Sequence, residues 1–316
     1  APINNQESFG RFRERPGAMA GGMFSRLATI NPCRTVGGGR MSQQSRSLAD
    51  WVAYLGQADL PVLKHTAREL ERLRGNEALL NARNVADVVT DDPLMTVKLL
   101  RHLQTHKHRK QAYELVDVKQ ALLMMGLDAF SREVPAMPIA EGMLNGHLDA
   151  LVHLLQTVRR AQRSAHYAYD WALRLHDLHA EEVHVSALLT HVAEMLMWCF
   201  NPGPMLEIKK RQHADPTLRS TEVQKAVLGF SGTDLQRQLT IEWQLPELLL
   251  NLMDPAQAKS TRVRNVMLAA NLARHSAQGW DNAALPDDFR DIASLLRMEP
   301  DKVRALVEAR PGAAHD

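Results

Sequence analysis

The chain has 316 residues, of which 45% are hydrophobic and 23% are charged, a composition typical of a globular protein with a substantial core. No apolar run reaches the roughly 18 residues that a membrane-spanning helix needs, so we expect no contact with a membrane. The two cysteines, Cys33 and Cys199, lie far apart in the sequence, which argues against a disulfide framework and favours a reducing, cytoplasmic setting.

The first 47 residues differ in composition from the rest of the chain. They hold seven arginines against Glu7 and Glu14, a charge of +5, which leaves −3 for the remainder because the whole chain carries +2. They also hold seven of the 17 glycines, so residues 1–46 are predicted to be a disordered basic tail. A transit peptide, or an extension upstream of a start at Met41, fits the same composition. The acidic remainder argues against nucleic-acid binding, except through this tail.

From Ser47 onward, apolar residues recur at helical spacing and no strand alternation is visible, which predicts an all-α fold. A first apolar stripe covers 63–73. Asp92 and Pro93 form an N-cap and a proline at the first helical position, which predicts a helix that continues to about 103. The next stripe covers 118–125 and is closed by Gly126 as a C-cap.

The second part of the chain begins with the longest predicted helix, over 148–175, which would be about 40 Å long. A further apolar pattern predicts a helix over 181–200 that stops at the prolines and glycine of 201–204. Trp243 is predicted to pack at the end of a later helix. The remaining helices are predicted at 220–230, 233–243, 246–253, 261–276, 287–297 and 300–309.

Two groups of segments resemble the HDOD domain. The first contains "LPVLKHTARELERLRGN", "NVADVVTDDPLMTVKLLRHLQ" and "VDVKQALLMMGLDAF", and the second contains "VSALLTHVAEMLM", "VLGFSGTDLQRQLTIEWQLPELL" and "VRNVMLAANLARH". The resemblance covers about 48–310. It implies an all-α domain over 47–316, in which an N-terminal helical half (about 47–146) packs on a degenerate HD-like half (about 147–316). HDOD domains are relatives of HD phosphohydrolases, and most are thought to act in bacterial signalling and regulation without being enzymes.

The same resemblance locates the positions that hold a metal in an HD hydrolase, namely an early His, a His-Asp pair and a late Asp. The early His aligns with Arg163, the pair with Thr190 and His191, and the late Asp with Asn271, while a further His aligns near Gly232. Arginine cannot lose its proton and would put a fixed cation where the metal would lie. The resemblance therefore implies no catalytic residues, no bound metal and no cofactor.

Three alternatives remain open for Arg163. Its guanidinium could hydrogen-bond to the Asn271 side chain and nearby carbonyls, so that the site is filled. It could instead point to solvent. It could also join His191 in a contact to an anion such as a nucleotide phosphate, which would make a sensing pocket without hydrolysis.

A literal His-Asp pair occurs elsewhere, in "LHDLHAEEVH". His176 and His179 are three residues apart and could share a helix face, with Glu182 or His184 completing a metal-binding group with Asp177. A solvated polar connection explains the same residues.

A second histidine group, His102, His106 and His108, lies in a basic segment at a predicted helix end. The alternatives for it are a contact to an anion or partner and a solvated turn.

The sequence therefore predicts a non-catalytic signalling or regulatory module that binds a partner protein or a small effector in a bacterial cytoplasm. One alternative is a divergent HD-type metal-dependent phosphohydrolase that uses His176, Asp177, His179 or His191. A second alternative is nucleic-acid contact through the arginine-rich tail, which would depend steeply on salt.

Overall fold

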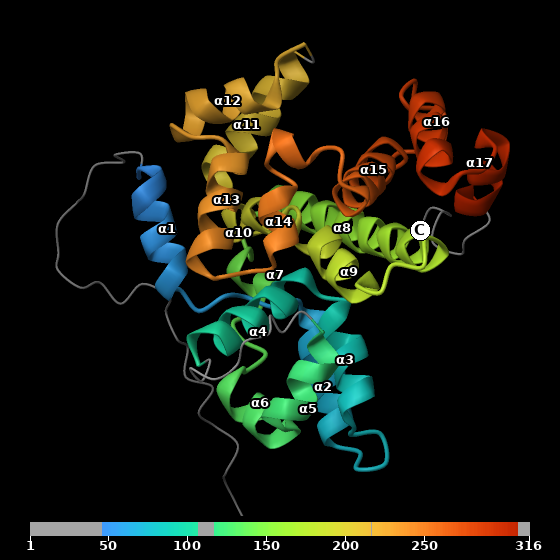
Figure 1. The fold of residues 1–316 in the computed structure, drawn as a ribbon. Helices are drawn as coiled ribbons and strands as arrows, with labels where there is room; N and C mark the ends of the chain where they lie inside the picture. The colour runs from blue at the N-terminus through green and yellow to red at the C-terminus, as the bar shows by residue number, and fades with distance from the viewer. Residues whose placement is uncertain (1–45, 107–116, 216, 309–316) are drawn as a thin grey trace, which may run out of the picture. The chain divides into compact units, whose positions relative to one another are not determined.

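The computed structural model describes residues 46–106, 117–215 and 217–308 (Figure 1). Within these ranges the regular structure is helical, as predicted, and the β-type pairing is a single isolated parallel bridge between Val62 and Ile139. Apart from Arg46, the predicted basic tail lies outside the described residues, as do Cys33 and His108, so its disorder stays a prediction. The division of the domain near residue 146 also stays a prediction.

The predicted caps of the first half are confirmed. The Asp92 carboxylate accepts hydrogen bonds from the backbone N–H groups of Leu94 and Met95, and Pro93 is the first helical residue. Gly126 closes its helix with a φ of 83°, a conformation that favours glycine. The helices are α1 (Leu48–Gln57), α2 (Lys64–Arg74), α3 (Ala82–Thr90), α4 (Pro93–Thr105), α5 (Val118–Met125), α6 (Leu127–Glu133) and α7 (Ala140–Met143).

The second half is built around the long predicted helix. This helix, α8 (Leu148–Arg174), lies beside α9 (Ala180–Leu189) and α15 (Thr261–His275) (Figure 1). The remaining elements are α10 (Val192–Phe200), α11 (Pro202–Ala214), α12 (Ser220–Leu228), α13 (Gly232–Glu242), α14 (Glu247–Asn251), a 3-10 turn (Pro255–Gln257), α16 (Leu285–Leu296) and α17 (Pro300–Glu308).

One prediction for this half is wrong, and one helix was not predicted. The single helix predicted over 181–200 is two helices, because the chain breaks at Thr190 and His191 between α9 and α10. Helical structure does stop after Phe200, as predicted, but a further helix, α11, begins at Pro202. Proline suits that position because the first N–H of a helix has no partner within the helix.

Helix α4 joins the two halves through two apolar faces. Met95 and Leu99 belong to a small core formed by the first half, while Leu94 and Leu100 belong to the large core around α8. All four side chains are buried. The N-terminal half therefore packs on the HD-like half, as the resemblance implied.

The segment Ala180–Phe200 is long and apolar enough to cross a membrane by length and composition, so the expectation that no such segment exists was too strict. Within it, 72% of the most apolar window is buried inside the domain. The break at Thr190 interrupts this segment. In this structure it forms the centre of the large core.

Candidate functional site

The break between α9 and α10 is held by a buried side chain from another helix. Gln236 of α13 donates its Nε2 hydrogen to the carbonyl of Leu189 at 3.1 Å and accepts from the N–H of Ala193 at 2.9 Å. Only 6% of Gln236 is exposed. The groups that a continuous helix would pair with each other are therefore paired with one amide, which explains why the helix ends here.

Replacement of Gln236 by leucine is expected to lower the free energy of unfolding by about 2 kcal/mol, because it keeps the volume but leaves a buried N–H and a buried carbonyl without partners. Urea denaturation measures this loss. The matched control is Gln120→Leu on α5, where the glutamine is exposed. Equal stability of the two variants would show that Gln236 does not hold the break.

His191 lies beside a carboxylate that is already paired. Burial lowers the pKa of His191; Glu194 opposes this shift, while Arg160 and Arg274 add to it. The Glu194 carboxylate lies 3.6 Å from the Arg160 guanidinium and accepts from the Trp198 indole at 3.4 Å. The His191 imidazole therefore lies next to a half-buried ion pair between Glu194 and Arg160.

Arg163 is held by the end of α15. Its Nη2 donates to the Ser276 hydroxyl at 2.8 Å and its Nη1 donates to the Ser276 carbonyl at 3.3 Å. A cation suits this place because the carboxyl end of a helix is negative. Of the alternatives left open for Arg163, the contact to a nearby carbonyl is present, but the hydrogen bond to Asn271 is not, because the Asn271 oxygen accepts from Arg274 at 3.0 Å.

The four aligned positions gather where α8, the break and α15 meet. Arg163 contacts α15 through Ser276, and Arg274 contacts Asn271 and lies close enough to His191 to lower its pKa. The guanidinium group of Arg163 therefore lies at a position that the resemblance aligns with a metal ligand of an HD hydrolase, and that of Arg274 contacts another such position, Asn271. Among residues 46–308, apart from the gaps, no group of three or more His, Cys, Asp or Glu side chains could hold a metal ion. An anion contact by Arg163 and His191 stays a prediction.

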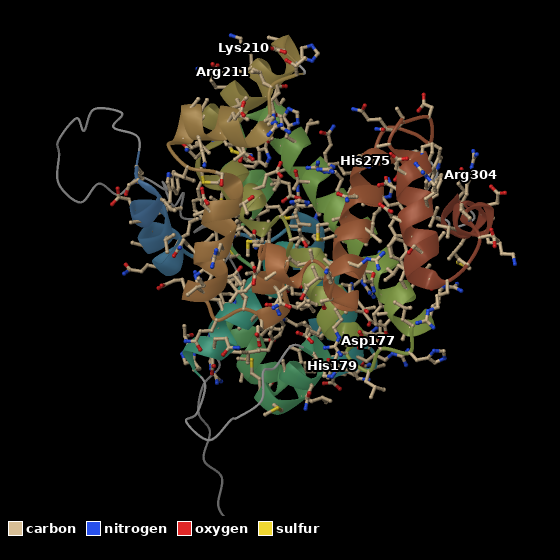
Figure 2. All side chains as sticks on the ribbon, turned by 45° about the horizontal axis from the view of Figure 1, so that its top comes forward. Asp177, His179, Lys210, Arg211, His275 and Arg304 are labelled. Carbon is tan, nitrogen blue, oxygen red and sulfur yellow. The ribbon has the colours of Figure 1, made fainter. Side chains whose placement is uncertain are left out.

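The literal His-Asp pair lies in a different place. Figure 2 labels Asp177 and His179 apart from His275 on α15. Helix α8 ends at Arg174, and His176 follows it with a φ of 55°. His176 and His179 therefore do not share a helix face, contrary to the prediction.

The carboxylates near this pair are occupied by an arginine. Arg262 donates to both oxygens of Asp177, at 2.8 and 2.9 Å, and lies 3.6 Å from Glu182. Burial would raise the pKa of Asp177, but the hydrogen bonds from Arg262 and from the His179 N–H lower it. His184 points elsewhere, with its ring 6.2 Å from that of His166. The Arg262 guanidinium thus occupies the carboxylate oxygens that a metal at this pair would need as ligands.

Sequence reasoning missed a cavity that several of the residues discussed above line together. His102 and His106 do lie at a helix end, as predicted, and their rings stack at 4.1 Å. Trp243 does pack at the end of α13, as predicted. However, His102 and Trp243 also line one cavity together with Arg101 of α4. The "KLLR" and "WQLP" segments of the resemblance were the available signals, but nothing local indicates that they meet.

Comparisons with known proteins agree with this fold. The HDOD domain model matches residues 60–258. The MmoQ response regulator from Methylococcus capsulatus is 15% identical with a TM-score of 0.61, and the match covers 80% of this chain and 99% of that one. A virulence factor from Campylobacter jejuni is 16% identical with a TM-score of 0.62, and the match covers 85% and 99%. At these identities the likeness shows the fold alone. A search of curated proteins found no match.

Proposed function

Because the chain belongs to the HDOD family, we propose that it is a non-catalytic regulatory module that works in a bacterial cytoplasm by binding a partner protein or a small effector. The family assignment and the helical fold fit a regulatory role. Any output would then depend on what the domain binds.

One observation carries the non-catalytic part of this proposal: arginines occupy both places where a metal could be expected. Arg163 binds Ser276 at the aligned metal position, and Arg262 binds both oxygens of Asp177 in the literal His-Asp pair. A divalent metal needs several neutral imidazoles or free carboxylates that converge on one point. A fixed guanidinium excludes such convergence because it repels the metal and uses the same acceptors.

Metal analysis of the full chain purified without a histidine tag tests this proposal. It is paired with an assay for turnover of bis(p-nitrophenyl) phosphate with added Mn²⁺. We expect less than stoichiometric metal and no turnover above the rate with Mn²⁺ alone. One metal per chain, together with turnover that is lost in either Asp177→Ala or His191→Ala, would establish the divergent phosphohydrolase instead.

The nucleic-acid alternative concerns residues 1–46, and all but Arg46 lie outside the described residues. Removal of these residues is the direct test. Binding to duplex DNA that falls steeply with salt and is lost on removal of the segment would support this alternative.

A further inference from the structure

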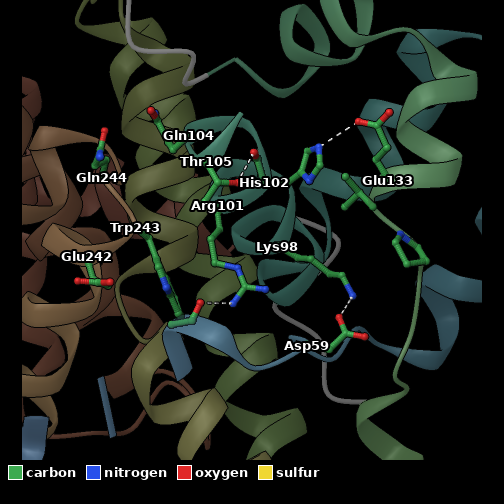
Figure 3. A pocket seen from close by; sticks show the side chains of 13 residues that line it. Asp59, Lys98, Arg101, His102, Gln104, Thr105, Glu133, Glu242, Trp243 and Gln244 are labelled. Atoms are coloured by element: carbon green, nitrogen blue, oxygen red, sulfur yellow. Dashed lines mark hydrogen bonds and ion pairs between the residues drawn. The ribbon is translucent and has the colours of Figure 1, made fainter. Parts of the chain in front are cut away.

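A cavity of about 470 Å³ lies between the two halves of the domain (Figure 3). This volume is within the range of roughly 300–1,000 Å³ that small-molecule sites occupy. Helix α4 lines it on one side, and the ends of α1, α6 and α13 line the others. A ligand here would therefore contact both halves at once.

The most buried cation in the cavity wall is already neutralised. Lys98 is only 5% exposed, and its Nζ lies 2.6 Å from Asp59. Nζ also donates to the carbonyls of Leu60 and Met137. The ammonium group has three donors, and all three have partners. Lys98 therefore stabilises the cavity wall through these contacts and has no free donor for a ligand.

Arg101, one turn further along α4, differs from Lys98. Its Nη1 donates to the carbonyls of Leu55 and Ala58, at 3.1 and 2.9 Å, which fixes the guanidinium against the end of α1. No carboxylate of the described residues lies within 4.0 Å of it. Figure 3 shows its side chain between Trp243 and Lys98. One positive charge and the remaining N–H groups of Arg101 are thus available to the cavity.

Three buried polar atoms in the cavity wall have no hydrogen-bond partner within the described part of the chain. They are the Nε1 of Trp243, whose side chain is 4% exposed, the Oε1 of Gln104, and the Nε2 of His102, which lies 3.3 Å from Glu133. The Arg101 guanidinium carbon lies 5.7 Å from the centre of the Trp243 ring. A buried donor without a partner costs about 1–3 kcal/mol, so such a group in a cavity wall indicates a missing partner.

The acidic side chains that line the cavity restrict the charge of a ligand that could bind there. Glu133 and the exposed Glu242 also line the cavity. Glu133 is bound by Arg132 at 2.9 Å and lies 3.3 Å from His102, without hydrogen-bond geometry there. Of the described residues that line the cavity, Arg101 is the cation without a carboxylate within 4.0 Å, and the acidic side chains oppose a polyanion. A nucleic acid or a nucleoside triphosphate does not fit this charge.

We infer that the cavity binds a small organic monoanion, whose carboxylate or phosphate oxygens accept hydrogen bonds from Arg101 and from the Trp243 indole. A donor on the ligand would serve the Gln104 oxygen. This inference rests on the proposed regulatory function and names the class of its small effector. Because α4 carries Arg101 and α13 ends at Trp243, occupancy would bridge the two halves.

Indole N–H resonances of the full chain labelled with ¹⁵N-tryptophan test the inference. The chain has five tryptophans, and Trp243→Phe identifies the signal of Trp243. The probes are benzoate and phenyl phosphate, a carboxylate and a phosphate of similar size, with sodium chloride as the ionic-strength control. We expect the Trp243 signal alone to shift and saturate with at least one probe, and the probe that acts identifies the anionic group.

Two variants make the result specific. Arg101→Gln is expected to weaken binding about 10-fold or more, since it removes a charged donor. Thr105→Trp fills the rim of the cavity from an exposed position and is expected to abolish the shift even if Arg101→Gln is poorly folded. An exposed arginine, Arg304, provides the control Arg304→Gln. A Trp243 signal that ignores both probes, or that still responds in Thr105→Trp, would overturn the inference.

The two proposals can fail separately. Metal-dependent turnover with a responsive Trp243 signal would remove the non-catalytic function and keep the site. If the chain binds no metal, shows no turnover and has a Trp243 signal that does not shift, the non-catalytic function is supported and the anion site is ruled out.

Discussion

Replacement of Asp92 by alanine is expected to lower the free energy of unfolding by about 3–5 kcal/mol. One carboxylate, 1% exposed, accepts three backbone hydrogen bonds. It caps α4 through Leu94 and Met95, at 2.8 and 3.1 Å, and binds the N–H of Leu63 at 2.9 Å. Alanine would leave all three buried donors without partners and would also remove the cap.

Urea denaturation at neutral pH measures this loss against a matched control. Asp117 caps α5 in the same way, through the N–H groups of Lys119 and Gln120, but these hydrogen bonds are exposed to solvent. Asp117→Ala is expected to cost about 1 kcal/mol, the ordinary value for an N-cap. If Asp92→Ala costs no more than Asp117→Ala, then the bond from Leu63 contributes nothing and α4 is not tied to the chain before α2.

Asp92 also shows which part of the fold could be predicted. The Asp92–Pro93 cap is a local pattern, since the carboxylate and the N–H groups it accepts from are two and three residues apart. The bond to Leu63 spans 29 residues, and no local pattern specifies it. The same holds at the break after α9, where Gln236 is 43 residues from Ala193. Without that amide, the apolar pattern over 181–200 indicates one continuous helix.

In the candidate site too, contacts between residues far apart in the sequence could not be predicted from local patterns. The resemblance located Arg163 and Asn271 on adjacent helices, but not the contact each makes. Ser276, which binds Arg163, is 113 residues away from it, and Arg262 is 85 residues from Asp177. The helix end near 175 was predicted, but the shared helix face suggested by the histidine spacing in "LHDLHAEEVH" is absent because His176 has a φ of 55° after the end of α8.

A second large effect is expected from His184 of α9. Its ring faces Tyr169 and His166 of α8, with centroids 5.5 and 6.2 Å away. Asp87 and Asp91 of the first half line the same small cavity. Burial, and then the charge of His166, lower the pKa of His184 to about 4. The ring is therefore neutral in the folded chain at a pH where it is charged in the unfolded chain.

The sign of the effect follows from proton binding. Between pH 6.5 and 4 the unfolded chain binds a proton at His184 and the folded chain does not, so acid favours unfolding. The stability that His184 contributes is complete above pH 6.5 and is lost as the pH falls towards 4. The loss is expected to be about 2 kcal/mol at pH 5 and about 3 kcal/mol at pH 4.

Urea denaturation of the wild type and of His184→Phe, from pH 4 to 8, isolates this contribution. Phenylalanine keeps an aromatic ring at this position but cannot bind a proton. The free energy of unfolding of the variant, relative to that of the wild type, is therefore expected to rise by about 3 kcal/mol as the pH falls from 8 to 4. Burial raises the pKa of Asp92 to about 6, which acts in the opposite direction, but both chains carry Asp92 and its effect cancels. His65→Phe, at an exposed position of α2, is the control for the same change of side chain at the surface. A difference for His184→Phe that does not vary with pH would mean that His184 binds its proton equally in the folded and unfolded chains, and the junction between α3 and α9 would then be insensitive to acid.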